Sequence, residues 1–309
     1  DIAILDIEDK ILNVAEAFDI VFWPCAMDFK LKDVDAMEDD SIFVTLFNGA
    51  IRTSEQEHIA RLLRRKSKVM VAFGSCAHEG CIPGLANLTS KKAIFQKVYH
   101  DKRWVENENG TEPQLKTEVP EGELELPEFY DKVNALDQVV DVDYYIPGCP
   151  PQSDKVWAVL DHLIQGKELP EKGSILGAGT KTCCDECPRE RKEKKIKKFY
   201  RPHEIIPNPD ECLMDQGMIC LGPATRDGCG AKCVTVGIPC RGCYGAAEGV
   251  ADQGMKMISA LSSVIDSKDP EEIDRIISTI SDPIGTFYRF GLAHSTLFRV
   301  QEDLKQNDE

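Results

Sequence analysis

The sequence predicts an α/β fold with a doubly wound parallel sheet over residues 1–170, and an irregular, cysteine-rich part ending in helices over residues 171–309. Two observations predict this division. Up to about residue 167, short apolar runs alternate with amphipathic helical patterns. Between residues 173 and 244 this periodicity almost vanishes, while proline, glycine and cysteine dominate. At 309 residues the chain also exceeds the usual size of one domain, which favours two.

Four short apolar runs in the first part are typical of buried strands. They are Val21–Trp23, Ser41–Phe47, Lys68–Phe73 and Val139–Ile146. Helical patterns stand between and after them, and strands that alternate with helices at this spacing form a parallel sheet.

Two helices of the first part have recognisable starts. Ser54-Glu55-Gln56-Glu57 is a capping box that opens a helix through Arg64. Ser153 caps a later helix whose apolar face is formed by Val156, Trp157, Leu160, Leu163 and Ile164. Between the two helices, residues 100–127 are rich in charge and proline, which indicates a surface insertion.

Helical periodicity returns after residue 252. One predicted helix presents Met255, Ile258, Leu261 and Ile265 on one face, and a second presents Ile273, Ile276, Ile277 and Ile280. The segment Asp282-Pro283-Ile284-Gly285 ends the second helix, because proline cannot continue it.

Composition excludes several classes of function. The formal net charge of −16 argues against nucleic-acid binding, which depends on basic side chains that neutralise phosphates. No stretch approaches the roughly 20 apolar residues of a membrane helix, and no secretory leader opens the chain. We therefore expect a cytoplasmic protein that neither binds nucleic acid nor spans a membrane.

The thirteen cysteines are the strongest functional signal, since nine of them fall between Cys183 and Cys243. A disulfide framework is the competing interpretation. The odd total, the adjacent pair Cys183 and Cys184, and the lack of a secretory signal all favour metal binding instead.

Two further cysteines, Cys76 and Cys149, each follow a predicted strand within a glycine-containing loop. Open α/β sheets bind ligands at that edge, so the pair would supply half of a four-thiolate site, although each would also serve as a small buried apolar residue. The chain begins at Asp1 inside a helical pattern, and we expect an upstream Cys-x-x-Cys to provide the other half. Cys25 and Cys81 rank below it as spare thiols.

The remaining ligand candidates form two foursomes in sequence order: Cys184, Cys187, Cys212 and Cys220, then Cys229, Cys233, Cys240 and Cys243. Thiolates alone bind either iron–sulfur clusters or zinc. A zinc ribbon sets its Cys-x-x-Cys pairs about 15 to 20 residues apart, and neither foursome does so. Cys187-Pro188 also matches the cysteine–proline usage of bacterial ferredoxins. The spacing favours iron–sulfur clusters, and a zinc-stabilised interaction module is the alternative.

With these motifs in order after a flavodoxin-like first half, the chain resembles the small subunit of [NiFe] hydrogenases, closest to the cytoplasmic methyl-viologen-reducing type associated with heterodisulfide reductase. The segments that carry the resemblance are Gly74–Ala77, Ile82–Leu85, Pro147–Pro151, Cys187–Arg189, Cys220–Thr225 and Cys240–Gly245.

This resemblance implies three [4Fe–4S] clusters in a line. Cys76 and Cys149 match two ligands of the proximal cluster, whose other two would lie upstream of Asp1. Cys229, Cys233, Cys240 and Cys243 match the medial cluster. Cys184, Cys187, Cys212 and Cys220 match the distal cluster, with Cys184 where many relatives have histidine. The pattern gives Cys81 and Cys183 no ligand role.

The function implied is electron transfer without catalytic residues in this chain. Dihydrogen would be split in a large partner subunit, and electrons would pass along the clusters to heterodisulfide reductase or to a small iron–sulfur adaptor subunit. The alternative is the same relay in a complex with another catalytic partner, for formate or heterodisulfide chemistry, without hydrogenase activity.

Overall fold

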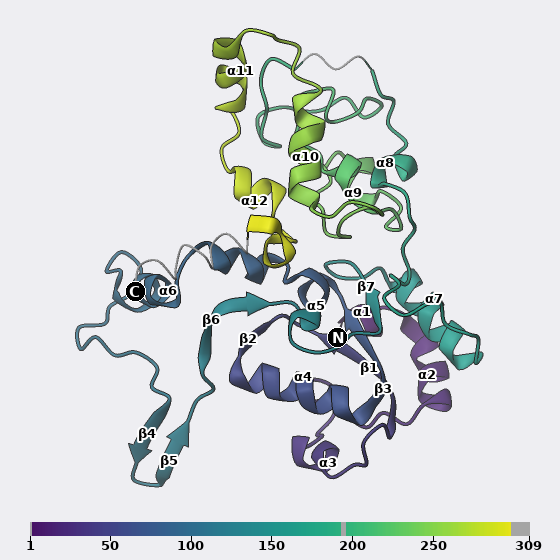
Figure 1. The fold of residues 1–309 in the computed structure, drawn as a ribbon, viewed down its shortest axis with the longest axis vertical. Coiled ribbons are helices and arrows are strands. Elements are labelled where there is room, and N and C mark those ends of the chain that lie inside the picture. Colours follow the sequence, from purple (N-terminus) through teal and green to yellow (C-terminus); the bar gives the residue numbers. More distant parts are fainter. Residues whose placement is uncertain (1, 193–195, 298–309) are drawn as a thin grey trace.

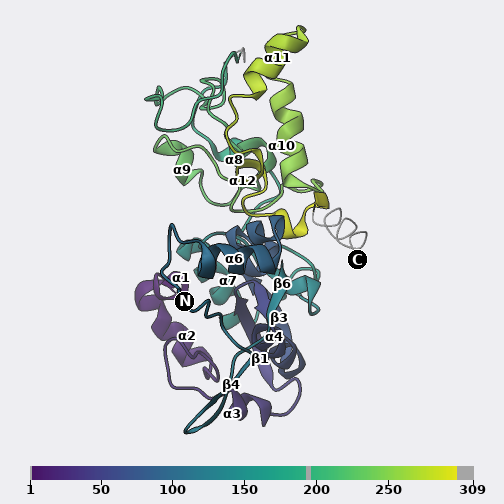
Figure 2. The ribbon, with the colours of Figure 1, turned by 90° about the vertical axis from the view of Figure 1, so that its left-hand side faces the viewer.

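The computed structural model describes residues 2–192 and 196–297, so Asp1 and the end of the tail lie outside the described residues. The chain forms two lobes that two perpendicular views separate (Figures 1 and 2). One lobe contains the sheet and the helices α1 to α7, and the other contains α8 to α11 together with long irregular loops.

The first lobe contains these elements: α1 Ile2–Leu5, η1 Glu8–Lys10, α2 Ile11–Ala17, α3 Leu31–Asp35, β1 Ile42–Asn48, β2 Ile51–Thr53, α4 Ser54–Lys66, β3 Ser67–Phe73, α5 Ser75–Glu79, η2 Ile82–Leu88, α6 Lys91–His100, β4 Lys116–Val119, β5 Gly122–Glu125, β6 Phe129–Asn134, η3 Leu136–Gln138, β7 Tyr144–Ile146 and α7 Ser153–Ile164. The remaining elements are α8 Cys183–Glu186, η4 Gly222–Ala224, α9 Lys232–Thr235, α10 Gln253–Ser262, α11 Pro270–Ile277, α12 Pro283–Phe287 and η5 Leu292–His294.

The main sheet has the strand order β1-β3-β7, and both pairings are parallel. Alternate residues of β3 face opposite ways. Met70 and Ala72 join the core under α4, while Val71 and Phe73 join the core that includes Val156 of α7. Helices therefore cover both faces, as a doubly wound fold requires, and the predicted fold class is confirmed.

Two of the four predicted strands differ from the structure. Val21–Trp23 lies outside the sheet as an irregular segment, and its first two residues pack against the core under α4. The run Val139–Ile146 contributes only Tyr144–Ile146 to the sheet. Its first two amides instead bond to the carbonyl of Leu136, at 3.0 Å each, and close a local turn.

In α4 and α7 the N-cap lies one residue before the position predicted from the sequence. Thr53, rather than Ser54, is the N-cap of α4; its side chain accepts from the amide of Gln56, and the Gln56 side chain bonds back. The helix continues past Arg64 to Lys66. Gln152 likewise precedes α7, of which Ser153 is the first residue.

The insertion between residues 100 and 127 contains the antiparallel hairpin β4–β5, whose residues are mostly exposed. Figure 1 shows it projecting from the sheet lobe. Within residues 2–192 and 196–297, no helix has the length and apolar character that crossing a bilayer takes.

Helix α10 buries only part of the face that the sequence suggested: Leu261 is buried and Ile265 packs against the core. Met255 and Ile258 are 54% and 44% exposed, whereas Met257 is buried. The reason lies at Gly254, where an added Cβ would stand 2.4 Å from the ring of Tyr288. This close approach fixes the rotation of the helix. In α11, Ile276 is buried as expected and Ile277 is 47% exposed.

Candidate functional site

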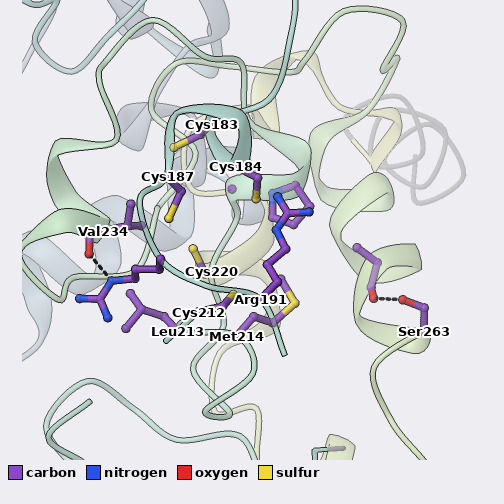
Figure 3. A pocket seen from close by; sticks show the side chains of 14 residues that line it. Cys183, Cys184, Cys187, Arg191, Cys212, Leu213, Met214, Cys220, Val234 and Ser263 are labelled. Atoms are coloured by element: carbon purple, nitrogen blue, oxygen red, sulfur yellow. Dashed lines mark hydrogen bonds between the residues drawn. The ribbon is translucent and has the colours of Figure 1, made fainter. Parts of the chain in front are cut away.

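Four of the predicted ligand cysteines, one whole foursome, surround a single cavity. The cavity measures about 110 Å³, and Cys184, Cys187, Cys212 and Cys220 all line it. Figure 3 shows the four sulfur atoms around a common space. The structure thus brings together residues that are up to 36 positions apart in the sequence, between Cys184 and Cys220.

Short hydrogen bonds hold the loops that carry these thiols. Cys184 lies in α8, whose N-cap Thr182 forms a capping box with Asp185. The amide of Cys212 donates to the carbonyl of Glu190 at 2.7 Å. These bonds fix the sulfur positions without a sheet or long helix.

Buried Arg189 ties three loops together by donating to the carbonyls of Val234, Asn208 and Glu211 at 2.6, 2.7 and 3.1 Å. Arg189 and Arg191 both line the cavity, and the guanidinium of Arg189 is held by these three carbonyls. The positive charge of Arg191 beside four thiols suits an anionic group.

Burial disfavours free thiolates in this cavity. Burial raises the pKa of Cys184 to about 11 and the pKa of Cys220 to about 12. Both would hold a proton at neutral pH by themselves, whereas a bound metal ion displaces the proton from a coordinating thiol. Within the described residues no three Cys, His, Asp or Glu side chains converge as ligands of a single metal ion. Thiols spread around a cavity fit a multi-iron cluster better than one zinc ion.

The second foursome lies directly beside the first. The amide of Cys240 donates to the sulfur of Cys220 at 3.3 Å. Burial raises the pKa values of Cys233 and Cys243, and the neighbouring thiolate charges of Cys229 and Cys240 raise them further. These four thiols therefore form one electrostatic group.

Glycines allow the ligand loops to approach closely. An added Cβ at Gly222 would lie 2.9 Å from the sulfur of Cys184, so a larger residue would displace a ligand. Gly242 has φ of +96°, which favours glycine. The pKa of Cys240 is lowered chiefly by its hydrogen bond with Cys183, and further by the Thr225 hydroxyl and the backbone of Gly242.

The third site lies where two strands of the sheet end. Cys76 lies in α5, directly after β3, and Cys149 follows β7; the Ser75 amide donates to the Gly148 carbonyl at 2.9 Å and joins the two segments. An added Cβ at Gly148 would stand 2.6 Å from Pro151, which explains the glycine. The peptide bond Cys149–Pro150 is cis.

Ser75 also joins this third site to the second foursome. Its hydroxyl donates to the carbonyl of Cys243 at 2.5 Å and accepts from the amide of Gly148 at 3.3 Å. The Cys243 sulfur further accepts a bond from the backbone of Cys149. The three groups of cysteines consequently form a continuous series.

Two cysteines without an expected ligand role touch these groups. Cys81 lies between Cys76 and Cys149, with its sulfur 3.8 Å from that of Cys149 and hydrogen-bonded to that of Cys76. Cys183 is buried and hydrogen-bonded to Cys229 and Cys240. Sequence reasoning missed both contacts; only the close spacings Cys76 to Cys81 and Cys183 to Cys184 hinted at them. Cys25 is exposed.

The residues after Cys76 form a buried polar pair. His78 packs against the Tyr145 ring at 4.8 Å, and burial lowers its pKa to about 4. Burial raises the pKa of Glu79 to about 7. Its carboxylate lines a cavity of about 180 Å³ that also includes Asp252 and His294.

Comparisons with known proteins show the family of the chain. Residues 1–163 match the family described as NADH ubiquinone oxidoreductase, 20 kDa subunit. The chain is 40% identical over 298 residues, covering 94% of this chain and 92% of the relative, to the iron-sulfur subunit of the F420-non-reducing hydrogenase of Archaeoglobus profundus. It is 36% identical over 296 residues, covering 94% of this chain and 89% of the relative, to a subunit of the F420-non-reducing hydrogenase of Methanothermobacter marburgensis. A crystal structure of an NAD+-reducing [NiFe]-hydrogenase matches with a TM-score of 0.46 and 27% identity, covering 55% of this chain and 86% of that chain.

Proposed function

We propose a route for electrons through this chain, which belongs to the family of small subunits of F420-non-reducing hydrogenases and is the iron–sulfur, electron-transfer subunit of such an oxidoreductase complex. In the proposal, electrons leave the nickel–iron site of a large partner subunit and cross three [4Fe–4S] clusters. They continue to a heterodisulfide-reductase-type acceptor or a small iron–sulfur adaptor subunit.

The observation that carries the proposal is the cavity lined by one complete foursome of thiols. In the proposal, Cys184, Cys187, Cys212 and Cys220 hold the distal cluster; Cys229, Cys233, Cys240 and Cys243 hold the medial one; and Cys76 and Cys149 supply thiolates to the proximal one. The contacts between Cys240 and Cys220, and between Ser75 and Cys243, support this order.

Each bound cluster would accept and pass on one electron at a time. The chain's own residues set the conditions for this. Backbone amides of Cys240 and Gly222 donate to the sulfur of Cys220, and such bonds stabilise the added negative charge. The positive charge of Arg191, which lines the same cavity, acts in the same direction.

A cytoplasmic location is part of the proposal. All thirteen cysteines lie within the described residues, and each of them is a free thiol there. Free thiols and thiolate-bound iron suit a reducing compartment.

Replacing Cys240 by alanine tests the relay. The variant complex, purified anaerobically, should lose about four irons per chain, the content of one all-cysteine cube. The low-temperature paramagnetic signals of the other clusters should remain. Hydrogen-dependent viologen reduction should fall strongly, because the route is interrupted, whereas isotope exchange between dihydrogen and water should persist in the partner subunit.

Cys25→Ala is the matched control, because Cys25 is an exposed cysteine outside all three groups. It should leave iron content and viologen reduction unchanged. Unchanged iron in Cys240→Ala would contradict the medial assignment. Zinc without the broad visible absorption of iron–sulfur clusters in the parent complex would contradict the proposed function itself.

A further inference from the structure

Ser75 is a buried serine at the junction of the two lobes. Its exposed fraction is 2%. It is the first residue of α5, and only Gly74 separates it from the end of β3. Figure 1 shows α5 on the side of the sheet lobe that faces the second lobe. Ser75 therefore lies where the sheet ends and the predicted ligand segments begin.

Ser75 contacts the backbone of three ligand segments that belong to two sites. In the proximal site, it directly precedes Cys76, and its amide donates to the carbonyl of Gly148, the residue before Cys149, at 2.9 Å. In the medial site, its hydroxyl donates to the carbonyl of Cys243 at 2.5 Å. One small side chain thus joins segments of both lobes.

The chemistry of the partners fixes the direction of both hydroxyl bonds. The amide of Gly148 can only donate, so the Ser75 hydroxyl oxygen accepts from it, at 3.3 Å. A carbonyl oxygen can only accept, so the hydroxyl proton points at Cys243. The hydroxyl completes a chain of bonds from one lobe to the other, and bonds in such a chain strengthen one another. Neither bond depends on the protonation state of a cysteine.

The turn that contains Cys243 is held from two directions. Buried Gln253, in the second lobe, donates to the carbonyls of Gly242 and Gly245 at 3.1 and 3.0 Å. The carbonyl of Cys243, between them in the sequence, is held from the sheet lobe by Ser75. Gln253 therefore fixes the shape of the turn within its own lobe, and the Ser75 hydroxyl fixes its distance from the sheet lobe.

We propose that Ser75 is a positioning residue that sets the spacing of the proximal and medial clusters and links their ligand segments by hydrogen bonds for electron transfer. This inference rests on the proposed function. An electron tunnels more slowly across a longer gap or one without bonded atoms. Alanine in place of Ser75 could neither accept from Gly148 nor donate to Cys243, so the link would be broken while every ligand cysteine stays in the chain.

Ser75→Ala and Ser75→Thr, each in the whole complex, test the inference. The alanine variant lacks the hydroxyl, and the threonine variant keeps it. Iron content and the reduction potentials of the clusters should match the parent complex in both, because the hydroxyl bonds to backbone groups rather than to ligand sulfurs. In Ser75→Ala, electrons from dihydrogen should reach the medial cluster severalfold more slowly. The magnetic interaction between the reduced proximal and medial clusters should also weaken. Ser75→Thr should recover both.

Rapid freezing after mixing with dihydrogen, followed by low-temperature electron paramagnetic resonance, measures how fast each cluster is reduced and how strongly the two interact. The medial signal is the one that Cys240→Ala removes. Ser295→Ala is the matched control, because Ser295 is also buried and its hydroxyl donates to the carbonyl of Leu292, three residues earlier, at 2.7 Å. It should change neither the transfer nor the magnetic interaction.

Unchanged transfer and an unchanged magnetic interaction in Ser75→Ala, with full iron content, would overturn the inference by leaving only a packing role. If Ser75→Ala loses iron, the threonine variant decides: full iron with the transfer rate of the parent supports the role of the hydroxyl, and iron loss or slow transfer in both variants overturns it. A parent complex without iron–sulfur clusters would instead contradict the proposed function, before any variant is compared.

Discussion

Two adjacent buried residues, His78 and Glu79, give the fold opposite responses to pH. The pKa of Glu79 is raised from 4.5 to about 7, so its contribution to the free energy of unfolding is complete below pH 4.5 and is lost as pH rises through 7. The pKa of His78 is lowered from 6.5 to about 4, so its contribution is complete above pH 6.5 and is lost as pH falls through 4. Between pH 4.5 and 6.5 a rise in pH therefore increases the contribution of His78 to the free energy of unfolding and decreases that of Glu79.

Glu79→Gln should reveal how the titration of His78 alone changes the free energy of unfolding with pH. The amide has the shape of the carboxyl group but does not titrate. From pH 5.5 to 6.5 the parent protein should keep a nearly constant free energy of unfolding, whereas the variant should gain about 1 kcal/mol per pH unit. Anaerobic thermal melts at both pH values measure this, and the gain should appear as a rise of a few degrees.

Three charged or titratable groups face Glu79 and also affect how the free energy of unfolding depends on pH, namely His294, Asp137 and Arg226. Asp137 and Arg226 are the same in both proteins. The pKa of His294 is raised by Asp137 and also by Glu79, so the variant loses the second effect, which adds to the gain expected from His78. Parallel profiles would show that Glu79 is charged in the folded state and that burial does not control its pKa.

Single cysteines are predictable to different degrees. Their order along the chain and the family resemblance group Cys184, Cys187, Cys212 and Cys220 as one foursome, and the structure collects them around one cavity. The contacts of Cys81 and Cys183 depend on how distant loops pack, which no local pattern records.

At the scale of elements, errors arise where packing competes with local pattern. The sequence of α10 supports more than one apolar face, and contact between Gly254 and Tyr288 selects the one that buries Met257. The apolar run Val21–Trp23 is strand-like in composition but remains outside the sheet. By contrast, the predicted bounds of β1 and β3 lie within one residue of the observed ones, because both are apolar runs of seven residues that pair with each other in the sheet.

The hairpin β4–β5 is an element that the fold does not need. Its residues are exposed apart from half-buried Val119, and its ion pairs, from Lys116 to Glu123 and Glu125, are internal. The carbonyl of Leu115 accepts from the amide of Leu126 at 2.9 Å just outside it.

Replacing Lys116–Glu125 by two glycines should leave the iron content of the complex and its melting temperature unchanged, since little apolar surface is lost. Iron analysis and anaerobic thermal melts of the purified complex check this. A lowered melting temperature or lost subunits would show instead that the hairpin packs against a neighbour in the complex.

At the scale of the whole molecule, the two lobes depend on different sources of stability. The sheet lobe has cores on both faces of β1-β3-β7, built from side chains such as Leu62, Met70 and Val156. In the second lobe, the described part of residues 171–252 contains only short helical turns, and Cys183, Cys220 and Cys240 are themselves part of the core. Loops of this kind are commonly held by metal–ligand bonds.

Removing iron should therefore unfold the second lobe selectively. After anaerobic chelation, amide hydrogen exchange should become fast across residues 171–252, because the ligand bonds that close those loops are gone. Exchange in β1, β3 and α4 should stay slow, because their apolar cores contain no predicted ligand. The Cys240→Ala complex, which should retain the distal cluster, is expected to lie between these extremes, with the segment around Cys229 to Cys243 loosened first. Uniform protection after complete iron loss would mean that side-chain packing alone holds the second lobe, and that the clusters contribute to electron transfer without contributing to the fold.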